Sequence, residues 1–365
     1  MNRQSILNRR RNYFKAKPVT VATLLAILIG TTFLLATTGC STGVQSGRDN
    51  ADSSSTSLAE LFADEHVWTA PDPSSIPLND EGKLISYGRR LIIHTSKYFG
   101  PTGSLSKSTN GMNCQNCHLD AGTRPYGNNL GAVASIYPKF SPRSGNVITI
   151  AGKVNECLTR SMNGTPIDTT SKEMNAFIAY IKWLGKDVKK GETPDGSGGI
   201  KAPHFIARAA DPEKGKEVFD QLCARCHGMD GQGQFVADVL KDKTKQQGGN
   251  ATKDDLFYYP ALWGSHSFNG VATLYRLSKF AGFVQNNMPY PISYKSPVLT
   301  NEEAWDVAAF VNSRERPMND HSKDYLVDIS KKPFDFPFAP YADTFSEDQH
   351  KFGPYIEMPS AKKAH

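Results

Sequence analysis

The pentapeptide Cys-x-x-Cys-His occurs twice in this chain, as Cys114-Gln115-Asn116-Cys117-His118 and as Cys223-Ala224-Arg225-Cys226-His227. The string attaches a c-type haem: its two thiols form thioether bonds to the haem vinyl groups, and its imidazole binds the iron as an axial ligand. A zinc site would instead need four converging ligands and would leave both histidines without a role. We therefore predict two covalently bound haems c, with attachment residues Cys114, Cys117, Cys223 and Cys226 and iron ligands His118 and His227.

The N-terminal region has the pattern of a bacterial export signal. Residues 1–17 carry six Lys and Arg without an acidic residue, and an apolar run from Val19 to Ala36 follows. The run ends in Thr37-Thr38-Gly39-Cys40, which is close to a lipoprotein cleavage site, although Thr37 stands where Leu is preferred. We expect lipidation of Cys40. An uncleaved membrane anchor and plain secretion are the alternatives, since the run is about the minimum length that spans a bilayer. All three place the folded part on the periplasmic side of a bacterial membrane.

Removal of this signal changes the charge balance of the chain. The full sequence has 42 basic and 36 acidic residues, a net charge of +6, and residues 1–39 hold six of the bases and none of the acids. The chain from Cys40 onward is therefore neutral. A neutral chain lacks the basic field that nucleic-acid binding uses, so we expect no nucleic-acid partner. An anionic ligand must be held by locally placed cations.

Composition predicts six consecutive segments. Residues 1–39 are the signal peptide, and residues 40–60, rich in Ser, Asp and Asn, are a flexible tether. Two haem domains follow, at 61–185 and 204–316, separated by a Gly- and Pro-containing linker at 186–203. The tail, 317–365, combines Pro with aromatic residues, which disfavours helix and predicts an extended strap lying over the body.

Capping patterns predict helices in both haem domains. Thr170 with Glu173 forms a capping box ahead of an apolar helical face, and Thr300 with Glu303 repeats the pattern. A further helix, 212–223, leads into the second haem motif. A helix before the motif and a helix closing the domain are typical of class I cytochromes c. The sequence thus predicts a mainly α fold of two class I cytochrome c-like haem domains in tandem.

The second axial ligand of the second haem is predicted to be Met288. It lies in Asn287-Met288-Pro289, 61 residues after His227 and just before the closing helix, where a class I cytochrome c carries its thioether ligand. Met229 and His266 are competitors. Met229 is too close to His227 to reach the opposite face of the iron, and His266 lacks the Met-Pro context.

The first haem domain has no comparable Met-Pro segment, but it has Cys157, the cysteine that no other pattern explains. Arg143, Lys153 and Arg160 are its neighbours in sequence. Cations lower the pKa of a thiol and hold anions, so this pattern indicates a reactive thiolate. Two alternatives stay open at this point: Cys157 as a small buried apolar residue, and Met162 as an ordinary thioether ligand.

Four stretches together resemble the dihaem thiosulfate dehydrogenases, which also act as tetrathionate reductases. They are Asn113 to Gly122, Tyr137-Pro138, Arg143 and Val154 to Gly164, within a resemblance that runs from about Pro71 to the Gln349 to Pro354 segment. The resemblance implies that the first haem is the active site. The site residues that it implies are the iron ligands His118 and Cys157 and, around the substrate, Arg143, Lys153, Arg160 and Ser161.

The same resemblance implies the role of the second haem, ligated by His227 and Met288, which passes electrons on. Two departures from the family pattern matter. Some relatives have Lys before the Met ligand and exchange the two, whereas this chain has Asn287, so we expect no such exchange. Lys153 stands where Arg is expected, which weakens a bidentate anion contact there.

The activity that the resemblance implies is the coupling of two thiosulfates to tetrathionate, with two electrons released to the two haems. The implied partners are thiosulfate, tetrathionate, and a periplasmic electron-transfer protein or quinone-linked chain. A thiolate ligand lowers a haem potential and a Met ligand raises it, which favours oxidation of thiosulfate. The alternatives are a dihaem electron-transfer cytochrome without its own substrate and a haem-thiolate sulfur carrier. A reactive Cys157 separates a catalyst from an electron carrier.

Overall fold

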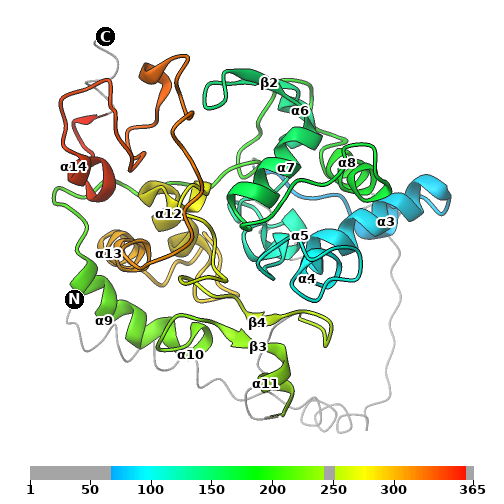
Figure 1. Ribbon diagram of the computed structural model, residues 1–365, viewed down its shortest axis with the longest axis horizontal. Coiled ribbons are helices and arrows are strands. Elements are labelled where there is room, and N and C mark those ends of the chain that lie inside the picture. Colours follow the sequence, from blue (N-terminus) through cyan, green and yellow to red (C-terminus); the bar gives the residue numbers. More distant parts are fainter. Residues whose placement is uncertain (1–66, 242–250, 359–365) are drawn as a thin grey trace, which may run out of the picture. The chain divides into compact units, whose positions relative to one another are not determined.

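Two pairs of packed helices organise the part of the chain that the computed structural model describes, residues 67–241 and 251–358 (Figure 1). In each pair the helix that precedes a haem motif packs against the helix that closes the domain. Within these ranges no helix is both long and apolar enough to cross a membrane. The predictions for the signal peptide, for Cys40 and for the tether at 40–60 lie outside the described residues.

The first domain is built on α3 and α8, which pack against each other. Its core contains the fully buried side chains of Leu91, Phe177 and Tyr180. β1 and β2 form an antiparallel hairpin, with Lys139 opposite Ile148. The elements are η2 (Pro73–Ser75), α3 (Asp80–Ile93), α4 (Thr95–Phe99), η3 (Cys114–Asn116), α5 (Leu119–Gly122), α6 (Val133–Ile136), β1 (Lys139–Ser141), β2 (Asn146–Ile148), α7 (Ile150–Arg160) and α8 (Lys172–Leu184).

The cap that begins α8 differs by one residue from the prediction. Ser171, not Thr170, is the N-cap, and its hydroxyl accepts a hydrogen bond from the backbone N–H of Met174. The Thr170 hydroxyl instead donates to the carboxylate of Asp168, at 2.9 Å. Because the Thr170 hydroxyl is bound to Asp168, the hydroxyl of the next residue, Ser171, caps the helix.

The second domain repeats the plan with α9 against α13. Asp211 caps α9, and the predicted capping box of Thr300 and Glu303 at α13 is confirmed. β3 pairs antiparallel with β4. The elements are α9 (Pro212–Leu222), α10 (Ala224–His227), β3 (Gln234–Phe235), α11 (Val236–Lys241), β4 (Phe257–Tyr259), η5 (Thr273–Tyr275), α12 (Leu277–Asn287) and α13 (Asn301–Asn312).

A glycine sits at the helix contact in both domains. A Cβ atom on Gly88 of α3 would collide with the backbone carbonyl oxygen of Ala176 in α8. A Cβ atom on Gly215 of α9 would collide with that of Asp306 in α13. The missing side chain therefore lets each pair of helix backbones approach closely, which a larger residue would prevent.

We expect Gly215→Ala and Gly88→Ala to destabilise the protein, because the added methyl forces each helix pair apart. The cost of such overpacking is about 1–3 kcal/mol. Gly152→Ala in α7 is the matched control: its Cβ would meet nothing nearer than 3.7 Å, and alanine favours helix by about 1 kcal/mol over glycine. Thermal unfolding followed by circular dichroism measures all three variants. Equal unfolding temperatures for Gly215→Ala and the native chain would contradict the close helix contact.

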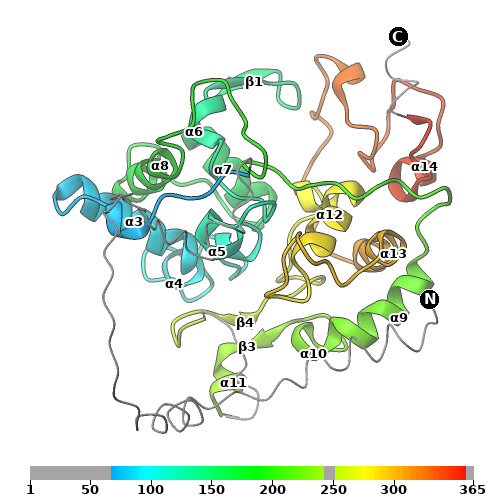
Figure 2. The same ribbon diagram turned by 180° about the vertical axis from the view of Figure 1, so that it is seen from behind.

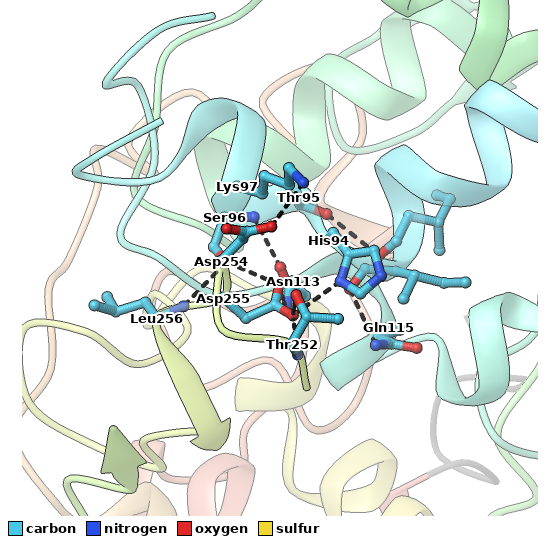
Figure 3. Close-up of polar contacts among 12 residues, drawn as sticks. His94, Thr95, Ser96, Lys97, Asn113, Gln115, Thr252, Asp254, Asp255 and Leu256 are labelled. Carbon is cyan, nitrogen blue, oxygen red and sulfur yellow. Dashed lines mark hydrogen bonds and ion pairs between the residues drawn. The ribbon is translucent and has the colours of Figure 1, made fainter. Parts of the chain in front are cut away.

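The two domains meet at a buried carboxylate, Asp255, whose side chain is 0% exposed (Figure 3). Its oxygens accept hydrogen bonds from Asn113 Nδ2 at 3.1 Å and Thr252 N at 2.8 Å, and lie 2.8 Å from His94 Nδ1. Asn113 directly precedes the first haem motif. A residue of the second domain thus braces the attachment loop of the first.

The segment 186–203 connects the two domains and lies against α12, as Figure 2 shows from behind. The amide of Asn286 in α12 donates to the carbonyl oxygen of Lys201 at 2.7 Å, and Ile200 is buried. On the first domain, Gly198 N donates to Asn129 Oδ1 at 2.8 Å. The C-terminal part of the connection, residues 196–203, therefore contacts both domains.

The described part of the tail, 317–358, has little regular structure, as a strap requires, but it contains one helix that the sequence did not predict. This helix is α14 (Glu347–Phe352), and a short turn, η6 (Ile329–Lys331), precedes it. Tyr355 is buried against Trp305 of α13, with ring centroids 5.4 Å apart. The tail therefore contributes to the hydrophobic core of the second domain.

Candidate functional site

A cavity of about 340 Å³ lies beside the first Cys-x-x-Cys-His motif. The two cysteines and the histidine of this motif, Cys114, Cys117 and His118, all line the cavity. Most of the other walls are apolar and include Ile92, Leu130, Val133, Ile150, Phe177, Phe268 and Leu274. An apolar slot with two thiols and an imidazole at its edge suits a large planar group bound through thioethers.

Both motif histidines are oriented for iron. Nδ1 of His118 is hydrogen bonded to the carbonyl oxygen of Asn128, and Nδ1 of His227 to that of Pro260, at 2.8 Å. A carbonyl partner on Nδ1 leaves Nε2 as the unprotonated ring nitrogen that binds a metal. Burial lowers the pKa of both imidazoles, which keeps them neutral as ligation requires.

The donor set fits a haem better than a bare ion. Within the described ranges no three His, Cys, Asp or Glu side chains are grouped to hold a metal ion. The thiols and the imidazole are instead spread along one wall of the cavity. This arrangement agrees with covalent attachment of a macrocycle whose own nitrogens complete the metal site.

Helix α7 delivers the predicted catalytic side chains to the same cavity. Thr149 caps the helix, and Lys153, Cys157 and Arg160 follow at spacings of four and three, which place them on one helix face. All three line the cavity, and so does Ser161, the residue that ends the helix. Met162 lines it as well, so the thioether alternative for the iron ligand is spatially open.

Burial and the charges around Cys157 shift the pKa of its thiol in opposite directions. Burial raises the pKa of the Cys157 thiol, whereas the ammonium of Lys153 lowers it. Glu156 acts in the same direction as burial, and its carboxylate lies 3.1 Å from Lys153 Nζ. The net effect raises the pKa of Cys157 above its ordinary value, against the sequence expectation, and Lys153 is the one cation among the causes that favours the thiolate.

The two predicted arginines share a partner that the sequence did not reveal. Arg143 and Arg160 both line the cavity, and both bind the carboxylate of Asp324 in the tail. Asp324 lies 181 residues from Arg143 and 164 from Arg160 along the chain, so no local pattern could have found it.

Met288, the predicted ligand of the second haem, is the residue that ends α12. Met288 and Cys223 both pack against one hydrophobic core cluster. The competing residues are placed otherwise: Met229 is 70% exposed, and His266 contacts the carbonyl oxygen of Asn110 in the first domain at 3.0 Å. Asn287 is buried, and its amide donates to Phe283 O at 3.0 Å.

We expect Met288→Gly to remove the thioether-to-iron absorption band of the second haem. Loss of a thioether ligand also lowers that haem's reduction potential, so electron exit slows. The thiolate signature of the first haem in electron paramagnetic resonance stays. Met229→Gly is the control and leaves the band unchanged. Survival of the band in Met288→Gly would show that another Met is the ligand.

Comparison with known protein families finds two matches on this chain. The SoxA/TsdA cytochrome c domain matches residues 104–189, and the cytochrome c family matches residues 212–315. Each match contains one of the two haem motifs. Two cytochrome c domains in tandem, each with one covalently bound haem c, are thereby confirmed.

Comparison with individual proteins finds relatives along most of the chain. A thiosulfate dehydrogenase of Stutzerimonas stutzeri is 34% identical over 264 residues, which are 72% of this chain and 78% of that protein. One of Psychrobacter arcticus is 32% identical over 248 residues, 68% of each chain. The solved thiosulfate dehydrogenase TsdBA of Marichromatium purpuratum is 28% identical with a TM-score of 0.60. That match covers 73% of this chain and 52% of the solved one, so the present chain spans about half of it.

Proposed function

The chain belongs to the thiosulfate dehydrogenase family of c-type cytochromes, and from this premise we propose that it couples two thiosulfates into tetrathionate. The observation that carries the proposal is the position of Cys157, which lines the cavity of the first haem motif beside Lys153. An electron-transfer cytochrome gains nothing from a thiol at this place, whereas sulfur coupling needs one.

The proposed chemistry uses the Cys157 sulfur as a nucleophile and as a leaving group. The thiolate forms a disulfide-type bond with the outer sulfur of one thiosulfate, giving Cys-S-S-sulfonate and releasing two electrons. Haems held at the two Cys-x-x-Cys-His motifs would supply the acceptors for these two electrons. A second thiosulfate then attacks the outer sulfur, forms tetrathionate and expels the Cys157 thiolate, which closes the cycle.

Cations of the cavity wall oppose the repulsion between the reacting dianions. Lys153 lies one helical turn before Cys157 on α7. Arg143, in the turn between β1 and β2, also lines the cavity. Arg143 Nη1 has no protein partner among the described residues, which leaves its two N–H groups for an anion. Fixed donors of this kind stabilise negative charge that gathers during bond formation.

We further propose that the reaction takes place on the periplasmic side of the membrane. The basic N-terminus, the apolar run after it and Cys40 support this location, with a lipid on Cys40 or the run itself as the anchor. The electrons would pass from the second haem to a periplasmic electron-transfer protein or a quinone-linked chain. Cys157 as a ligand of the first haem and Met288 as a ligand of the second would favour this direction of flow, because a thiolate lowers a haem potential and a thioether raises it.

The experiment that tests the function is steady-state oxidation of thiosulfate by the purified dihaem protein with ferricyanide as electron acceptor. We expect one tetrathionate for every two electrons accepted. Fast haem reduction by dithionite without thiosulfate turnover would instead indicate an electron-transfer cytochrome. Sulfur that stays bound to Cys157 without tetrathionate release would indicate a carrier.

A further inference from the structure

A single buried carboxylate from the C-terminal tail holds both arginines of the cavity wall. Asp324 Oδ2 accepts from Arg143 Nε at 2.8 Å and from Arg160 Nη1 at 3.0 Å, and Asp324 Oδ1 accepts from Arg160 Nη2 at 2.7 Å. The Asp324 side chain is 2% exposed. Three charge-assisted hydrogen bonds at one desolvated carboxylate fix the positions of both guanidinium groups.

The surroundings of Asp324 reinforce this arrangement. Arg143 Nη2 also donates to the carbonyl oxygen of Val271 at 2.9 Å, so the guanidinium is anchored from two sides. The backbone N–H of Tyr325 donates to the carbonyl oxygen of Arg143 at 2.8 Å. The tail therefore binds Arg143 both through the backbone of Tyr325 and through the side chain of Asp324. Lys139, Lys153 and Glu156 are the other charged groups that line this cavity.

The charge of the cluster suits an anion site. Two guanidinium groups and one carboxylate leave a net charge of +1, and Lys139 and Lys153 add two positive charges against the one negative charge of Glu156. Arg143 keeps Nη1 and Arg160 keeps Nε without a protein partner in the described ranges. If the carboxylate were missing, the two guanidinium groups would repel each other and would lose three of the contacts that hold them at the wall.

We propose that Asp324 is a positioning residue for thiosulfate: it fixes Arg143 and Arg160 so that their remaining N–H groups stay at the cavity wall. This inference rests on the proposed function. It also assigns part of the active site to the tail, because Asp324 lies beyond both matched family ranges, 104–189 and 212–315.

The test is the kinetics of Asp324→Asn in the full dihaem protein. We expect the KM for thiosulfate to rise about 10- to 100-fold, the range for losing charge-assisted hydrogen bonds, while kcat stays within about 3-fold. The inhibition constant of sulfate, an inert dianion, rises in parallel. In a background that carries both Arg143→Gln and Arg160→Gln, the added Asp324→Asn substitution changes the KM less than about 3-fold, because Asp324 acts through these two arginines.

Asp306→Asn is the matched control. Asp306 forms a bidentate pair with Arg208, at 2.7 Å for both contacts, and its side chain is 5% exposed, but neither residue lines the cavity. Its loss lowers the unfolding temperature and leaves the KM unchanged. A KM rise as large as that of Asp324→Asn would show that the effect is one of stability, and would overturn the inference.

The remaining outcomes separate this inference from the proposed function. A native protein without thiosulfate turnover overturns the function itself. Native turnover with an unchanged KM in Asp324→Asn overturns only the role of Asp324. If Asp324→Asn does not fold, Asp324→Glu decides: its longer carboxylate displaces both guanidinium groups, so the KM rises at least about 3-fold, and a native KM overturns the inference.

Discussion

Cys157→Ala is expected to abolish both thiosulfate oxidation and tetrathionate reduction in a protein that keeps its two haems. The haems are attached through Cys114, Cys117, Cys223 and Cys226, so loading does not depend on Cys157. Without the sulfur nucleophile the covalent route is closed, and we expect a loss of at least about 1000-fold in kcat, as for other enzymes that lose their nucleophile. Steady-state assays in both directions, with haem content measured by absorption, provide the check.

Met162→Leu is the control for this variant, because Met162 lines the same cavity and is the competing candidate for the iron. It should retain activity and the spectrum of the first haem. Native turnover in fully haem-loaded Cys157→Ala would rule out the sulfur mechanism. A spectral change in Met162→Leu would move the iron ligand from Cys157 to Met162.

Arg143→Gln is expected to lower kcat/KM for thiosulfate by about 10- to 1000-fold, the range for loss of a charge-assisted contact at a reacting anion. Reduction of the second haem by dithionite in a stopped-flow instrument should barely change. Arg160→Gln should cost less, since both Arg160 terminal nitrogens are already bound to Asp324, whereas Arg143 keeps Nη1. Lys153→Arg should be mild, because a guanidinium offers a forked contact.

Arg208→Gln serves as the control for Arg143→Gln, since it removes an arginine with an equally buried aspartate partner away from the cavity. It should leave kcat/KM unchanged. Equal losses in thiosulfate turnover and dithionite reduction in Arg143→Gln would mean that Arg143 supports the haem or the fold. The substrate would then be bound by other residues.

Local patterns were sufficient for much of this protein. The two haem motifs, the helix predicted at 212–223 and the Thr300–Glu303 capping box are each contained in a short stretch of sequence. The structure and comparisons confirm them, with the helix ending one residue earlier, at Leu222. The helix α7 was not predicted, but once it has formed, the spacing of Lys153, Cys157 and Arg160 places them on one face, because residues three and four apart on a helix are neighbours. The catalytic role of Cys157 stays a prediction.

The sequence predicted the wrong N-cap where two neighbouring hydroxyl groups were both able to cap the same helix. Thr170 and Ser171 are both able to cap a helix, and only the contact of Thr170 with Asp168 decides for Ser171.

The helix α14 was missed because its six residues lie in a tail whose prolines and aromatics disfavour helix. Tertiary contacts, not propensity, stabilise it: His350 is buried against Tyr341 of the tail, and Phe352 packs against the hydrophobic core.

The sequence by itself therefore determined the cofactors and the tandem domains. Only the tertiary structure decided that Asp324 binds both arginines and that Asp255 braces the first haem motif from the second domain. These carboxylates look like ordinary surface acids in the chain. Burial makes each of them dependent on partners more than 140 residues away, and that choice of partner exists only once the tail and the two domains have packed.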